Sequence, residues 1–215
     1  MRDAPEHPIT VTPHHCALST DRVGGEGAGI DATLTPLSDE QKAVVVEALT
    51  GKNLLVYGGA GVGKSLLVRH LDTKLNEGEK VLVVTAFTGC AAIVVNGSTL
   101  HSFAGIGLGE EPKEELAKMA VNNASTRKRW LKTEALVIDE VSMIDDRLLE
   151  TIDHVARVCR GVDKPMGGMQ VIMVGDHFQL PPVVKEGQEV LLAFEGLTWK
   201  SLKLKPMHLE QVRVE

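Results

Sequence analysis

The stretch "GGAGVGKS", Gly58–Ser65, decides the fold class of this 215-residue chain. It fits the pattern G-x-x-x-x-G-K-[ST], and it stands between the apolar run "NLLVY" and the helical pattern "LLVRHL". This strand–loop–helix setting is the one in which the pattern binds phosphate. The alternative is a glycine turn that only caps a helix, and the strand and helix flanks count against it. The stretch therefore predicts a phosphate-binding loop.

The residue types of this loop suit a nucleotide. Backbone N–H groups turn inward around an anion most easily at residues without a Cβ, and the start of the following helix adds its dipole. Lys64 would meet the β- and γ-phosphates, and the Ser65 hydroxyl would bind Mg²⁺. We therefore predict ATP and Mg²⁺ as ligands. The predicted nucleotide contacts in the loop are Gly58, Gly59, Ala60, Gly61, Val62, Gly63, Lys64, Ser65 and Leu66.

Apolar runs alternate with helical patterns along most of the chain. Continuous apolar strands separated by helices predict an α/β fold, with a mostly parallel sheet covered by helices on both faces. In such sheets, ligands collect at the carboxyl ends of the strands. The polar residues Thr85, Asp139 and Asp176 fall there, as does Gly58. The predicted strands are 53–58, 80–86, 135–139 and 169–176, and the predicted helices are 38–49, 65–75, 89–95, 113–130 (with one or two breaks) and 145–159.

The composition is that of an ordinary globular protein, with 43% hydrophobic and 24% charged residues. The net charge of −6 means that nucleic-acid binding would need a local groove. The apolar runs are too short for a membrane span, and the first residues do not form a secretory signal. Three widely separated cysteines favour a reducing compartment, with buried thiols. We therefore expect an intracellular protein with no membrane partner. The cysteines are Cys16, Cys90 and Cys159.

The first 33 residues differ from the rest in composition and in apolar pattern. They carry several prolines and the run "VGGEGAG", with little apolar periodicity. We interpret residues 1–33 as a disordered leader and residues 34–215 as one ATPase domain.

Two acids, Asp139 and Glu140, end the apolar strand "ALVID". Asp139 would hold the Mg²⁺ shell, and Glu140 would orient and deprotonate the water that attacks the γ-phosphate. A polar strand end without a catalytic role is the alternative. Ser142 and Asp145 have the spacing of a capping box that opens the next helix, and we prefer that interpretation for them.

Three other segments distinguish between the ATPases that share such a loop. In "GDHFQLPPV" (175–183), Gln179 could sense the γ-phosphate through an uncharged amide, and the two prolines stiffen the exit. In "TAFTGCAAIVVNGSTLHSF" (85–103), hydroxyls and backbone amides could grip a nucleic-acid backbone and a ring could stack on a base. A helix N-cap at Thr88 and a core position for Phe103 explain the same residues equally well. In "LSDEQ", the Gln41 amide could pair with the adenine edge, although this signal is weak alone.

Taken together, these motifs resemble those of the superfamily-one helicases, and more closely those of the petite-integration-frequency helicases, a branch related to the bacterial RecD subunit. The motifs occur in the family's order over Pro36 to about Gln211: "LSDEQ", "GGAGVGKS", "TAFTGCAA" with "GSTLHSF", "LVIDEVSMID" and "GGMQVIMVGDHFQLPPV". The resemblance implies a RecA-like P-loop NTPase core, 5′-to-3′ movement on single-stranded DNA, and unwinding of duplexes and folded DNA in repair, recombination or telomere maintenance.

The resemblance also implies roles for individual residues. Gln41 would read adenine, and Lys64, Asp139, Glu140 and Gln179 would form the catalytic set, with Gln179 coupling the γ-phosphate to DNA. The DNA contacts that we predict are Thr88, Gly89, His101 and Phe103. Two departures stand out. His177 replaces the family's usual aromatic residue, and "HLEQVRVE" is one residue short of the family's Leu-x-x-Val-Phe-Arg-Gln, so Arg213 is a poor match for its arginine.

Helicases of this class bind ATP between two RecA-like domains, and we interpret this chain as the first of them. We expect it to bind Mg·ATP, to hydrolyse it weakly and not to unwind DNA alone. The expected partners are single-stranded, forked or structured DNA and a second RecA-like domain. If the source is a eukaryote, we expect the protein in the nucleus, the mitochondrion or both. The alternative is a nucleotide-dependent module that grips single-stranded DNA or a protein without translocating.

Overall fold

The structure is a computed structural model that describes residues 36–77, 80–176 and 191–212. The interpretations of residues 1–33, His177, Gln179 and Arg213 lie outside the described residues. The strands are β1 (Leu54–Gly58), β2 (Leu82–Ala86), β3 (Ser98–Thr99), β4 (Ala135–Asp139), β5 (Gln170–Gly175) and β6 (Lys205–Leu209). The helices are α1 (Asp39–Leu49), α2 (Lys64–Glu77), α3 (Gly89–Val94), α4 (Leu100–Ala104), α5 (Lys113–Asn122), α6 (Ala124–Lys132), α7 (Asp146–Arg160) and α8 (Leu197–Leu202), with 3₁₀ turns η1 (Val141–Met143), η2 (Pro165–Gly168) and η3 (Ala193–Glu195).

The six strands form one parallel sheet in the order β3-β2-β4-β5-β1-β6. This order confirms the predicted parallel α/β architecture. Because every strand runs the same way, all carboxyl ends lie along one edge of the sheet, the one that runs across the strands, and polar loops meet there. In the middle of that edge β5 separates β1 from β4, and β2 lies on the far side of β4.

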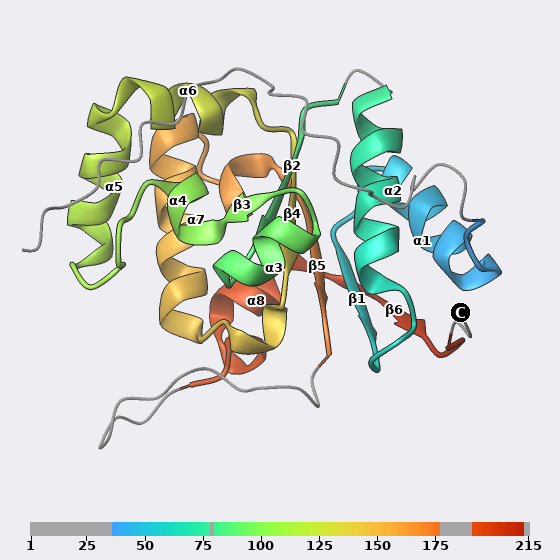
Figure 1. Ribbon diagram of the computed structural model, residues 1–215. Coiled ribbons are helices and arrows are strands. Elements are labelled where there is room, and N and C mark those ends of the chain that lie inside the picture. Colours follow the sequence, from blue (N-terminus) through green and yellow to red (C-terminus); the bar gives the residue numbers. More distant parts are fainter. Residues whose placement is uncertain (1–35, 78–79, 177–190, 213–215) are drawn as a thin grey trace, which may run out of the picture. The chain divides into compact units, whose positions relative to one another are not determined.

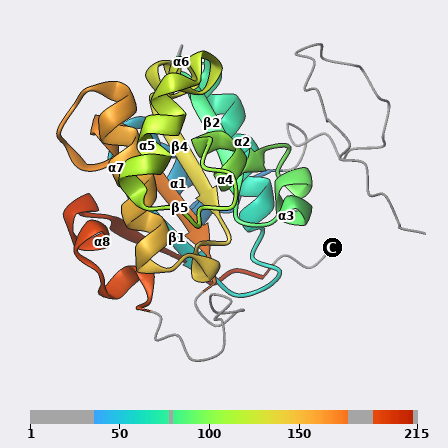
Figure 2. The same ribbon diagram turned by 90° about the vertical axis from the view of Figure 1, so that its left-hand side faces the viewer.

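Helices cover both faces of the sheet (Figure 1), as the apolar strands predict. One core packs α1, α2 and α3 against the sheet, with Val44, Leu67 and Ala92 buried in it. The other core packs α4 to α8 against the opposite face, with Trp130 and Ile152 among its buried residues. The turned view in Figure 2 shows α5, α6 and α7 stacked over that second face. Among the helices of the described residues, none combines the length and apolar character needed to span a membrane.

Two edge strands were not predicted from the sequence. β6 pairs with β1 in parallel register, from Leu54 opposite Lys205 to Gly58 opposite Leu209. Its sequence "KPMHL" contains a proline and three exposed residues. Proline is tolerated at a sheet edge because one side of the strand has no ladder to join. β3 contains only two residues, too few for any periodic pattern.

The helical segment 113–130 breaks once, at Asn123. This residue ends α5 and begins α6, because its side chain accepts a hydrogen bond from the Thr126 N–H at 3.0 Å. The predicted capping box at Ser142 is wrong. Asp145 itself caps α7 by accepting from the Leu148 N–H at 2.7 Å, while Ser142 lies in η1.

The cysteines only partly fit the expectation of buried thiols. Cys159 is buried on α7, and burial raises its pKa to about 11, so its thiol stays protonated at neutral pH. Cys90 is exposed on α3, so the expectation is wrong for this residue. Cys16 lies outside the described residues.

Candidate active site

The loop between β1 and α2 has the backbone that its glycines predict. Gly61 has φ +81° and Gly63 has φ +78°, the left-handed region that side-chain-bearing residues rarely adopt. At Gly58 a Cβ would lie 2.4 Å from the carbonyl oxygen of Leu209 on β6. The loop therefore needs glycine at these positions for its own shape, and Gly59, Ala60 and Gly61 form its exposed crest.

Lys64 begins α2 and turns its ammonium group back into the loop. Nζ donates hydrogen bonds to the carbonyl oxygens of Gly58 at 2.7 Å and of Gly59 at 2.8 Å. Partial burial lowers the pKa of Lys64, while the charges of Asp176 and Asp139 oppose that change. A cation held by two carbonyls beside two carboxylates can exchange the carbonyls for phosphate oxygens without moving far.

The charges of Asp139 and Asp176 act on Lys64 from the ends of two different strands. Asp139 ends β4 and is 7% exposed, so burial raises its pKa, and the Lys64 charge acts in the opposite direction. Asp176 follows β5, which lies between β1 and β4, and it is 6% exposed. We had not predicted Asp176 as a site residue. The signal was present, because the aspartate comes directly after an apolar strand.

Gln41 joins the first turn of α1 to the loop. Its amide oxygen accepts from the Ser38 N–H at 3.0 Å, and its amide nitrogen donates to the carbonyls of Val62 at 3.0 Å and Gly63 at 3.3 Å. The Ser38 hydroxyl accepts from the Gln41 N–H at 3.2 Å, which confirms the predicted serine N-cap. Gln41 is 1% exposed. Its role as an adenine reader stays a prediction.

Glu140 points toward β2. One carboxylate oxygen, Oε2, accepts hydrogen bonds from the Thr88 N–H at 3.2 Å and from the Thr88 hydroxyl at 2.7 Å. The same hydroxyl accepts from the Ala91 N–H at 3.2 Å, so Thr88 is the N-cap of α3. Of the two interpretations left open for Thr88, the N-cap is confirmed. Its role in DNA binding stays a prediction.

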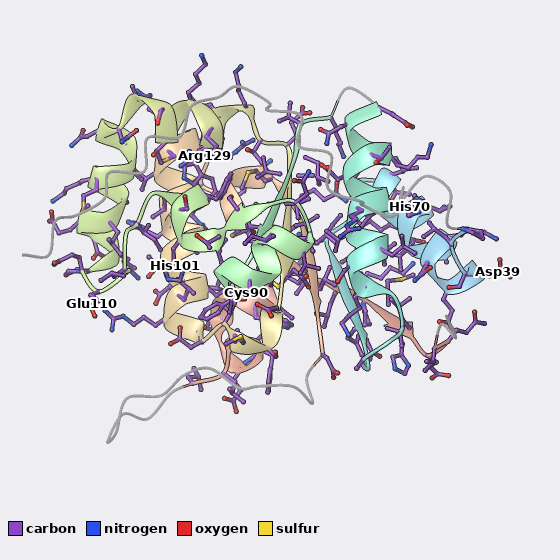
Figure 3. The ribbon with its side chains drawn as sticks, viewed as in Figure 1. Asp39, His70, Cys90, His101, Glu110 and Arg129 are labelled. Atoms are coloured by element: carbon purple, nitrogen blue, oxygen red, sulfur yellow. The ribbon has the colours of Figure 1, made fainter. Side chains whose placement is uncertain are left out.

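Gly89 and His101 follow β2 and β3 at the same edge of the sheet, and the side chain of Phe103 is buried. His101 is half-buried on α4, with its ring edge-on to Phe87 at 6.0 Å between centroids, and both line a cavity of about 180 Å³ that Met143 and Asp145 complete. Burial lowers the pKa of His101, and the Asp145 charge opposes this. Figure 3 shows His101 on the α4–α7 side of the sheet, opposite Asp39 at the start of α1.

Phe103 is a core residue. It is 1% exposed, and its ring packs on Trp130 at 4.7 Å between centroids. The prediction that Phe103 stacks on a base is therefore wrong, because the ring has no free face. Thr85 is also buried, and its hydroxyl donates to the carbonyl of Val137 on β4 at 2.7 Å, so it cannot grip a strand.

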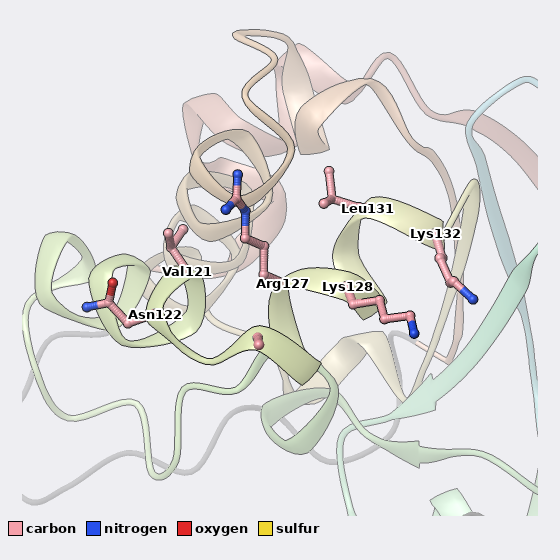
Figure 4. Close-up of a pocket in the computed structure, with 7 residues that line it drawn as sticks. Val121, Asn122, Arg127, Lys128, Leu131 and Lys132 are labelled. Carbon is pink, nitrogen blue, oxygen red and sulfur yellow. The ribbon is translucent and has the colours of Figure 1, made fainter.

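A second cavity, of about 600 Å³, lies away from this edge (Figure 4) and was not predicted. It opens between α5 and α6, and α6 leads into the amino end of β4. The cavity therefore lies toward the opposite edge from the phosphate loop. Its lining is basic and apolar: Val121, Asn122, Ala124, Arg127, Lys128, Leu131 and Lys132.

Comparisons with known proteins place the chain in a family. The model of the PIF1-like helicase family matches residues 36–213. The ATP-dependent DNA helicase PIF1 of Emericella nidulans is 42% identical over 176 residues, which are 79% of this chain and 24% of that protein. The chain thus spans about a quarter of the length of this curated relative.

Two solved structures resemble the fold. The Pif1 helicase from Candida albicans has a TM-score of 0.80 and 41% identity, over 84% of this chain and 41% of that one. The Pif1 helicase from Bacteroides, in complex with ADP-AlF3 and ssDNA, has a TM-score of 0.72 and 32% identity, over 83% and 43% of the two chains. The family match covers most of the chain, and this chain therefore belongs to the PIF1-like helicase family.

Proposed function

We propose that this chain is an ATP-binding motor domain of a DNA helicase that moves 5′ to 3′ along single-stranded DNA. The observation that carries the proposal is the meeting of Lys64, Asp139 and Asp176 at the glycine loop, in a chain of the PIF1-like helicase family. Its nucleotide would be ATP. Its partners would be single-stranded, forked or structured DNA, with a second RecA-like domain completing the ATP site.

The loop residues would hold the phosphate chain. Gly61 and Gly63 have the left-handed φ angles that would let the loop turn its N–H groups toward the phosphates, and Lys64 would pair with the β- and γ-phosphates. Gln41 already contacts the loop carbonyls and would read the adenine edge from there.

Ser65 and Asp139 would hold Mg²⁺. Their chemistry fits, because a hydroxyl and a carboxylate are oxygen ligands, and because burial raises the pKa of Asp139 in a way that a nearby dication would reverse. When bound, Mg²⁺ neutralises charge on the β- and γ-phosphates.

Glu140 would act as the general base. In turnover the water oxygen bonds to the γ-phosphorus, the bond to the bridging oxygen of ADP breaks, and the water proton passes to the Glu140 carboxylate. Gln179, which lies outside the described residues, would sense the γ-phosphate. Thr88, Gly89 and His101 would contact the strand at the same sheet edge. We place this activity inside the cell, on nuclear or mitochondrial DNA, because a eukaryotic DNA helicase is among its relatives.

ATP turnover with and without a single-stranded oligonucleotide tests the proposal. We expect weak turnover that the oligonucleotide stimulates, and we expect Glu140→Gln to bind ATP while losing turnover by about 100-fold or more. The matched control is Glu115→Gln on α5, which removes only an exposed ion pair with Lys118. Normal turnover by Glu140→Gln would refute the assigned base. ATP-dependent strand binding without any turnover would favour the binding module instead.

A further inference from the structure

Because Glu140 follows an inner strand of the sheet, its side chain can turn toward the strand ends on either side. β4 has β2 on one side, and on the other it has β5 followed by β1. The phosphate loop follows β1 and Thr88 follows β2, so the two lie on opposite sides of Glu140 along the sheet edge. The Glu140 carboxylate accepts hydrogen bonds from the N–H and the hydroxyl of Thr88. In this structure it is therefore turned away from the loop where the γ-phosphate would lie.

The backbone of Glu140 suggests that this orientation is held in place by its surroundings. Its φ of 58° and ψ of 42° lie in the left-handed region, which a side-chain-bearing residue keeps only when neighbouring contacts fix it. The Glu140 N–H donates to Asp139 Oδ1 at 2.9 Å, and the side chain is tied to Thr88. The backbone of Glu140 is therefore anchored to the end of its own strand, β4, and its side chain to the residue that follows the neighbouring strand β2.

We propose that Thr88 is a positioning residue that holds Glu140 in a resting orientation, and that a single strand releases the carboxylate by taking over the N–H and hydroxyl of Thr88. This inference rests on the proposed function, in which Glu140 is the base and the strand runs past Thr88. It goes beyond that function by assigning Thr88 a second task. One threonine then couples strand binding to ATP turnover, because its donors cannot serve the carboxylate and the strand together.

Three variants separate this task from the N-cap task of Thr88. Thr88→Ala removes both the hydroxyl donor and the cap, and Thr88→Ser keeps both. Thr88→Asp keeps a cap acceptor for the Ala91 N–H, since aspartate caps helices at least as well as threonine, but it repels the Glu140 carboxylate. An effect shared by the Ala and Asp variants and absent from the Ser variant therefore belongs to the Glu140 contact.

The readout is single-turnover ATP hydrolysis with and without a single-stranded oligonucleotide. We expect the Ala and Asp variants to raise the strand-free rate several-fold, with an unchanged half-saturating concentration of ATP and with the stimulation ratio falling toward one. The Ser variant should behave as the wild type does. A strand-free rate that stays at or below the wild-type rate in both the Ala and Asp variants overturns the inference, whether or not the strand stimulates turnover. Loss of ATP binding by the wild type would instead refute the proposed function.

A second measurement tests the contact without turnover. Urea midpoints of Thr88→Ala, Glu140→Ala and the double variant, all free of nucleotide, form a double-mutant cycle. We expect the double variant to shift the midpoint by less than the sum of the single shifts. Additive shifts would show that the two side chains do not interact in solution, and would overturn the inference.

Discussion

Asp139 has a location that favours function over stability. It is almost fully buried at the end of β4, and burial raises its pKa more than its contacts lower it. A carboxyl group whose pKa is higher in the folded state than in the unfolded state favours folding below its unfolded pKa. That contribution is lost as the pH rises through the folded pKa. At neutral pH the charged carboxylate therefore costs stability, which a nucleotide-bound dication would restore.

Asp139→Asn should for this reason stabilise the nucleotide-free chain at neutral pH. The amide keeps an acceptor for the Glu140 N–H but carries no charge. We expect the free energy of unfolding to rise by about 1 kcal/mol, and the gain should shrink as the pH falls toward 3.8, the ordinary pKa of aspartate. Urea unfolding across pH measures it.

Asp39→Asn is the control for this prediction. Asp39 is exposed, and its hydrogen bond with Lys42 lowers its pKa, which is the opposite direction. Its replacement should give no gain at neutral pH. A destabilised Asp139→Asn variant at pH 7 would contradict the account of Asp139.

The contacts of Phe103 and Thr88 could not be predicted from the sequence, because their partners lie far away along the chain. The sequence left Phe103 open between a core and a base-stacking position, and the choice depends on Trp130, which packs on it from another helix. The sequence likewise left Thr88 open between a helix cap and a DNA contact, and the structure confirms the cap. Its bond to Glu140 joins residues 52 positions apart, and no local pattern contains that information.

The predicted elements are those whose own residues carry a clear local pattern. The inner strands are continuous apolar runs, and the phosphate loop has glycines where φ is positive. The strands that were missed, β3 and β6, form because they pair with β2 and β1 at the edges of the sheet. An edge strand keeps exposed residues and a proline, so its sequence differs little from that of a loop.

The break between α5 and α6 gives a prediction at the scale of elements. Asn123→Ala should lower the free energy of unfolding by about 1 kcal/mol, because it removes the acceptor for the Thr126 N–H at the start of α6. Asn122→Ala is the matched control, since this exposed residue is the last of α5 and should change stability little. Equal stabilities for the two variants in urea unfolding would mean that Asn123 does not cap α6.

At the scale of the whole molecule, sheet order brings the site together. The loop, Asp176 and Thr88 follow β1, β5 and β2, and Asp139 ends β4. These strands lie in the order β2-β4-β5-β1, which differs from their order in the sequence. The motifs predicted the residue types and the parallel sheet predicted the common edge. Which charged residues act on each other across that edge, such as Asp176 on Lys64, depends on the strand order, and the motifs do not encode it.

The most direct test is nucleotide affinity. The measurement is a titration of the chain with a fluorescent ATP analogue and Mg²⁺, using wild type, Lys64→Ala and the control Lys132→Ala, whose exposed lysine lies on α6. We predict equal affinity for the wild type and Lys132→Ala, and a loss of about tenfold or more for Lys64→Ala, because a charged hydrogen bond to phosphate is removed. Wild-type affinity in a folded Lys64→Ala variant would contradict the phosphate-binding role of the loop.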